Sequence, residues 1–136
     1  MNFIDRAFET IDYGEGFLDA LKRGLKDNPE VRAELDKYPS WVSTVISAID
    51  YAMDYYQNGL QARSYEFEAN ILKKCHLNDD AEILLQISPE SSLDELKKLE
   101  ERLYINEYED TFWETLYGYI DGGLWNYHNP EDQYDL

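Results

Sequence analysis

The chain has 136 residues, of which 29 are acidic and 12 are basic, and its formal net charge at pH 7 is −17. This charge argues against direct binding to nucleic-acid phosphates or to anionic membranes, because both depend on Lys and Arg. A hydrophobic content of 43% and an aromatic content of 15% exclude a disordered acidic tail and, with the length, predict one folded domain.

Helices are predicted through most of the N-terminal half. Apolar side chains recur at helical spacing over residues 3–11, and Tyr13–Gly16 is expected to break that helix. Asn28 before Pro29 is a signature of a helix start. The longest apolar stripe of the sequence begins at Trp41, and Asn58-Gly59 is expected to end its helix. Three further helices are therefore predicted over 17–25, about 29–37 and 40–58.

The C-terminal half continues the helical pattern. Ala81–Ile87 fits either a short helix or a strand, whereas Ser92 and Glu95 form a capping box that predicts a helix start. A last helix is predicted over about 110–121, ended by Gly122-Gly123. The apolar faces of the two other helices here consist of Phe67, Ile71, Leu72 and Cys75, and of Leu93, Leu96, Leu99 and Leu103.

These elements predict an all-α bundle of about seven helices, in which residues 1–129 form a single acidic domain and residues 130–136 a frayed tail. The single cysteine cannot form an intramolecular disulfide, which indicates a reducing compartment. The N-terminal residues lack the apolar core of a signal peptide, and no run reaches the roughly 18 apolar residues of a membrane span. We therefore expect a cytoplasmic protein.

Residue patterns typical of catalysis and metal binding are not found. His76 and His128 are the only histidines, and His76 follows Cys75 directly, so on a helix the two side chains diverge and make a poor pair of zinc ligands. A calcium loop that started at Asn106 would need oxygen ligands and a glycine where the sequence has tyrosine and threonine. We therefore expect a protein that is not an enzyme and that has no metal, no cofactor and no catalytic residues.

The C-terminal segment 105–136 contains neither lysine nor arginine. Asp110, Glu114 and Asp121 share a broad face of the predicted last helix, and Glu107 and Glu109 precede it. Carboxylates at positions i and i+4 lie about 6 Å apart, which is near the spacing of successive phosphates along a nucleic-acid strand. The segment is thus predicted to present negative charge somewhat as a phosphate backbone does.

Aromatic side chains accompany these acids. Tyr108, Trp113 and Tyr117 are candidate anchors for a partner, because Tyr and Trp favour protein interfaces and stack on arginine. The alternative is that the aromatic residues pack the core and the carboxylates only face solvent. A second and weaker acidic line, also interspersed with tyrosines, consists of Asp50, Asp54, Glu66 and Glu68.

In size, charge and aromatic content the chain is similar to small acidic inhibitors that bacteria and their phages direct against nucleic-acid-handling proteins. The first hypothesis is a DNA mimic of the anti-CRISPR or anti-restriction kind, which occupies the basic groove of a defence nuclease in the cytoplasm of a bacterial host. Two alternatives stay open: an immunity protein for a cognate nuclease toxin, and an acidic helical scaffold or regulatory subunit. Because each chain carries a net charge of −17, repulsion between two chains favours a monomer, although a homodimer is possible.

Overall fold

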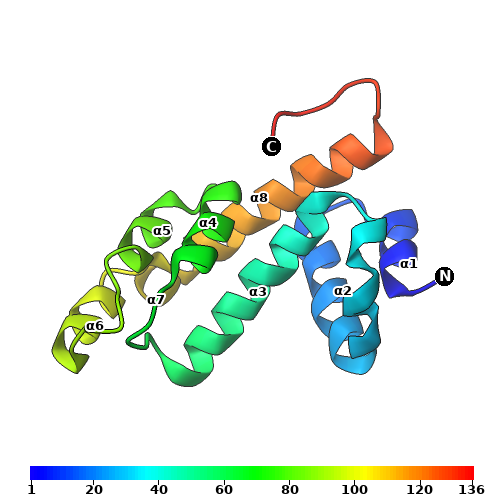
Figure 1. Ribbon diagram of the computed structural model, residues 1–136. Helices are drawn as coiled ribbons and strands as arrows, with labels where there is room; N and C mark the ends of the chain where they lie inside the picture. Colours follow the sequence, from blue (N-terminus) through cyan, green and yellow to red (C-terminus); the bar gives the residue numbers. More distant parts are fainter. The chain divides into compact units, whose positions relative to one another are not determined.

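The computed structural model describes residues 1–136 and contains eight α-helices, one 3₁₀ helix and no strands (Figure 1). The predicted all-α class is confirmed, and the segment around Ile83 that also fitted a strand is helical. No helix combines the length and the apolar character that a membrane span requires. Two sets of residues each pack among themselves: unit 1 comprises Met1–Ile46 and Leu116–Leu136, and unit 2 comprises Ser47–Thr115.

Unit 1 contains three complete helices and parts of two others. The complete helices are α1 (Phe3–Thr10), α2 (Gly14–Asp27) and the 3₁₀ helix η1 (Pro29–Lys37), and α1 lies beside α2 (Figure 1). The first residues of α3 (Ser40–Asn58) and the last of α8 (Glu109–His128) also belong to this unit. The third helix thus has the predicted position but the tighter 3₁₀ winding.

Aromatic side chains form the core of unit 1. Phe8, Phe17 and Trp41 are all buried, and their ring centroids lie 4.9 to 5.7 Å apart. Tyr127 stacks on Phe8 at 4.1 Å, which attaches the end of α8 to α1. Offset and edge-to-face contacts of this kind contribute beyond the area that they bury. Several aromatic residues therefore do pack the core.

Two pairs of glycines that were predicted to end helices lie inside them instead. Gly14 and Gly16 belong to the first turn of α2, and Gly122 and Gly123 lie within α8, which continues to His128. A Cβ atom on Gly14 would collide with the backbone carbonyl of Tyr117, and one on Gly123 would collide with the indole of Trp41. Gly14 and Gly123 therefore lack a side chain so that helices can pack closely. The predicted end of the last helix at Gly122-Gly123 was wrong, whereas the predicted break between the first two helices is present, at residues 11–13.

Unit 2 contains the remainder of α3, the start of α8 and four helices between them. These are α4 (Glu66–Lys74), α5 (Asn78–Leu84), α6 (Leu93–Glu100) and α7 (Tyr104–Glu107), and α4 packs against α5. The predicted serine cap of α6 is present, since Ser92 accepts a hydrogen bond from the Glu95 amide at 3.1 Å. The short helix α7 was not predicted. The largest fully buried side chains of this unit are Tyr65, Leu72, Leu84, Leu103, Ile105 and Phe112.

Three residues assigned to apolar helix faces have different environments in unit 2. Cys75 is fully buried, as its place on the apolar face predicts, and this burial raises the pKa of the thiol to about 12. Phe67 is 64% exposed, and Leu93 is also exposed. The apolar faces of α4 and α6 are therefore buried only beyond their first turns, where Phe67 and Leu93 lie.

The last seven residues have no regular secondary structure, and Figure 1 shows them turning back along α8. The side-chain amide of Gln133 donates to the carbonyls of Asn126 and Asn129, both at 2.9 Å. The Trp125 indole donates to the carbonyl of Asp132 at 2.7 Å. The segment that was expected to fray is thus hydrogen-bonded to the helix that precedes it.

Candidate functional site

Four carboxylates define an acidic patch in unit 2, consisting of Glu107, Glu109, Asp110 and Glu114. Glu107 ends α7, and the other three lie in the first two turns of α8. All four side chains are exposed. Acids at the start of a helix interact favourably with its dipole, so Glu109 and Asp110 stabilise α8 while facing solvent.

Hydrogen bonds orient one end of this patch. The Trp113 indole donates to the Tyr56 hydroxyl at 3.1 Å, and that hydroxyl donates to the Glu109 carboxylate at 3.3 Å. Partial burial is the main cause of the raised pKa of Tyr56, so the phenol stays protonated and able to donate. Tyr56 was not among the predicted partner-binding residues, because its spacing placed it on the apolar stripe of α3. It is 46% exposed and belongs with the patch.

The other three carboxylates of the patch make no hydrogen bond or ion pair within the protein. The salt bridges of unit 2 instead involve acids of α3, α4, α5 and α6. Tyr108, beside the patch, is 57% exposed, and its ring makes an edge-to-face contact with the Tyr104 ring, with 5.4 Å between the ring centroids. The patch therefore carries charge that no intramolecular cation neutralises, next to an accessible aromatic ring.

Two predicted partner-binding residues, Tyr117 and Asp121, belong to unit 1. The Asp121 carboxylate accepts a hydrogen bond of 2.5 Å from the Gly14 amide, the first residue of α2. It therefore caps that helix, which is a structural task that its position in the sequence did not indicate. The carbonyl of Tyr117 lies against Gly14 as well. The structure thus brings together only part of the predicted stripe.

The second predicted acidic line lies wholly in unit 2. Asp54 and Glu68 are half-buried and flank the guanidinium of Arg63, whereas Asp50 and Glu66 are exposed. Glu66 occupies the first turn of α4. Asp54 and Glu68 are consequently paired with a base of their own chain.

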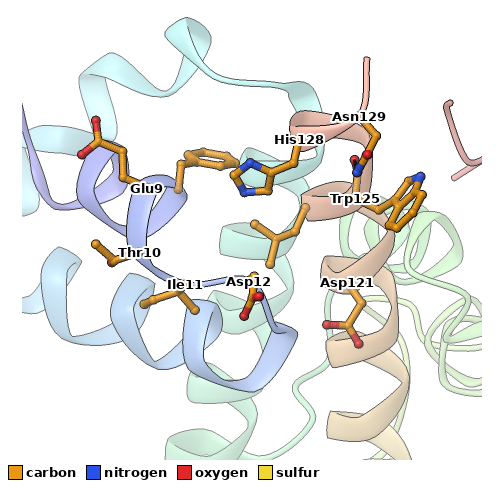
Figure 2. A pocket seen from close by; sticks show the side chains of 10 residues that line it. Glu9, Thr10, Ile11, Asp12, Asp121, Trp125, His128 and Asn129 are labelled. Carbon is orange, nitrogen blue, oxygen red and sulfur yellow. Dashed lines mark hydrogen bonds between the residues drawn. The ribbon is translucent and has the colours of Figure 1, made fainter. Parts of the chain in front are cut away.

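A pocket of about 650 Å³ lies in unit 1, between α1, the residues that follow it and the C-terminal part of α8. Figure 2 shows Asp12 and Asp121 along one end of it and His128 with Asn129 along the other. No hydrogen bond joins His128 to a carboxylate, so the pocket holds no assembled acid–base pair. No sequence pattern indicates this pocket, because its walls come from segments far apart in the chain. They are formed by Phe8, Glu9, Thr10, Ile11, Asp12, Asp121, Leu124, Trp125, His128 and Asn129.

Comparison with family models, with curated proteins and with solved structures found no match. No group of three or more His, Cys, Asp or Glu residues is arranged to hold a metal ion. What these surfaces do must therefore follow from their own chemistry.

That chemistry is electrostatic in the acidic patch. Unit 2 has 16 acidic and 6 basic side chains, and unit 1 has 13 and 6. A surface with such an excess attracts cationic groups and accelerates their association, most strongly at low salt. The patch is thus suited to bind a basic surface.

Proposed function

We propose that this protein is a non-enzymatic inhibitor whose acidic patch occupies the basic nucleic-acid-binding surface of another protein. The observation that carries the proposal is the exposure of Glu107, Asp110 and Glu114 without any intramolecular cation. Like charges at i and i+4 destabilise a helix by about 0.2–0.5 kcal/mol per pair. If this surface only had to face solvent, lysines between the acids would therefore make the helix more stable.

The spacing of the acids supports mimicry of a nucleic acid. Asp110 and Glu114 lie one helical turn apart, so their side chains are about 6 Å from each other. Glu109 is oriented in advance by Tyr56, and a group held in its binding geometry loses less entropy when a partner binds. A short row of carboxylates on a rigid helix resembles a row of phosphates in charge and in spacing.

Exposed aromatic rings extend the contact that such a surface can make. Tyr108 and Tyr56 each present a ring edge or face beside the carboxylates. Arginine, the residue that nucleic-acid-binding grooves use most, stacks on aromatic faces and pairs with carboxylates. The proposed target is therefore an arginine-rich groove, and a bacterial defence nuclease is the class of protein that fits it.

The first experiment is capture on the immobilised full-length chain from a bacterial lysate, washed with rising salt, followed by identification and purification of the bound protein. The purified partner is then titrated with this chain in the presence of duplex DNA. Mimicry predicts that DNA and this chain exclude each other from the partner. An immunity protein bound away from the active site would not be displaced by DNA, which would contradict the mimicry.

A charge-reversal pair tests the location of the binding surface. The double substitution Asp110→Lys and Glu114→Lys should weaken binding at least about tenfold more than Glu30→Lys with Asp36→Lys, which changes the net charge equally on exposed residues of η1. Equal losses in the two variants would mean that only total charge matters. Unchanged binding in the patch variant would favour the acidic scaffold instead.

A further inference from the structure

A second polar cleft lies in unit 2, where the loop between α3 and α4 meets both helices, and its volume is about 300 Å³. Three carboxylates line it, those of Asp50, Asp54 and Glu68, together with one base, Arg63. We call it the Arg63 cleft. None of the residues in it belongs to the acidic patch.

Arg63 already engages one side of this cleft. Its Nη2 atom lies 3.1 Å from Glu68 Oε2 and 3.9 Å from Asp54 Oδ2. The guanidinium carbon sits 3.8 Å from the centre of the Tyr65 ring, and Nη1 donates to the carbonyl of Ser64 at 2.9 Å. Carboxylates at the edge of a guanidinium and an aromatic ring on its face are the contacts by which proteins recognise arginine.

The cleft carries an excess of negative charge. Three carboxylates and a single guanidinium line it, and the Asp54 carboxylate also accepts a hydrogen bond from the Asn58 side-chain amide at 2.9 Å. Phe67, which also lines the cleft, leaves 64% of its surface to solvent. Tyr51 lines it as well, is only 4% exposed, and its hydroxyl has no hydrogen-bond partner. Since a buried polar group without a partner is costly, a ligand that supplied one would be favoured.

We propose that the Arg63 cleft binds an arginine side chain of a partner protein, with Arg63 as an internal occupant that shares the carboxylates with it. Asp50 and Asp54 pair with the incoming guanidinium, Phe67 covers its face, and the Tyr51 hydroxyl gains a partner. That the arginine comes from a nucleic-acid-binding groove rests on the proposed function. Arginine is preferred over lysine because a planar guanidinium stacks and forms paired hydrogen bonds, whereas a compact ammonium does not.

Blocked tripeptides test the site without any partner protein. The full-length chain is titrated with Gly-Arg-Gly, Gly-Lys-Gly and Gly-citrulline-Gly, and binding is followed by amide chemical shifts. The arginine peptide should shift signals of residues 50–68 and bind at least about tenfold more tightly than the isosteric, uncharged citrulline peptide. The lysine peptide should fall between them. Shifts scattered over all acidic segments would overturn the proposal.

Arg63→Ala provides a sharper test, with Lys97→Ala as its matched control. Both substitutions remove one positive charge from unit 2, but Lys97 is exposed on α6 and lies outside the cleft. The arginine peptide should bind Arg63→Ala several-fold more tightly than Lys97→Ala, because the internal competitor is gone. Equal gains in the two variants would show a general charge effect and overturn the proposal.

Tyr51→Phe separates ligand binding from folding. Because the hydroxyl has no partner in the free protein, its removal should leave the melting temperature unchanged or raised, while the arginine peptide binds several-fold more weakly. Unchanged peptide affinity would overturn the role of Tyr51. The Asp110→Lys and Glu114→Lys variant should bind the peptide with unchanged affinity, so a failure of the acidic patch and a failure of this cleft can be told apart.

Discussion

Asp80 shows how one buried charge organises part of unit 2. It is only 1% exposed, and its two carboxylate oxygens accept hydrogen bonds from the amides of Tyr104 at 2.7 Å and Ile105 at 3.2 Å. Both amides lie in the first turn of α7, so this side chain from α5 caps a helix 24 residues away. Burial raises the pKa of the carboxyl group, and the two hydrogen bonds oppose that rise.

We predict that Asp80→Ala lowers the free energy of unfolding by about 2–4 kcal/mol, because it leaves two buried amides without acceptors. Urea unfolding followed by circular dichroism measures this loss. Glu90→Ala, at an exposed loop position, is the control and should change stability by less than about 0.5 kcal/mol. If the two variants unfolded at the same urea concentration, the capping role of Asp80 would be wrong.

At the scale of the element, α8 contrasts two kinds of glycine. Gly118 is exposed, and a Cβ atom there would meet nothing within 4 Å. Gly123 is buried, and a Cβ atom there would collide with the indole of Trp41. Substitution by alanine should therefore change the free energy of unfolding in opposite directions at these two positions of one helix.

We predict that Gly118→Ala raises the free energy of unfolding by about 0.5–1 kcal/mol, since alanine loses less backbone entropy than glycine in a helix. Gly123→Ala should lower it by about 1–3 kcal/mol, because the added methyl group overpacks the core against Trp41. Denaturant unfolding of the two variants in parallel measures both signs. Stabilisation by both substitutions would mean that Trp41 can move aside freely.

At the scale of the whole molecule, charge repulsion opposes folding. The net charge is −17, and the sequence pI is about 4.2. The 29 acidic side chains outnumber the 12 basic ones, so most of the negative charge has no positive charge to offset it. The compact state brings these charges closer together than the unfolded chain does, so its stability depends on how strongly the solvent screens them.

We predict that the melting temperature at pH 7 rises as sodium chloride increases from about 0.01 to 0.5 M, because the Debye length falls from about 30 Å to only a few ångströms. The control is the same series near pH 4.2, where the net charge is close to zero and the rise should be much smaller. Differential scanning calorimetry gives both slopes. Equal slopes at the two pH values would exclude screening of net charge as the cause.

Sequence alone determined the features that depend on local spacing. Helical periodicity predicted the all-α class, because i, i+3 and i+4 contacts occur within one segment. Local capping and breaking residues predicted the bounds of α3 and of η1 and the cap of α6. Burial of Cys75 followed from the same spacing. The acidic C-terminal segment and the exposed carboxylates of α7 and α8 were also predicted, because a segment without lysine or arginine can be recognised from the sequence alone.

Only the tertiary structure decided what each acid and each glycine does. Asp121 caps a helix more than 100 residues away in sequence, Asp80 caps α7, and Asp54 and Glu68 hold Arg63. Gly14 and Gly123 resemble helix breaks until the helices that pack on them are known. Local propensity ranks conformations of one segment, whereas a hydrogen-bond partner or a steric contact is supplied by another segment, and only folding brings the two together.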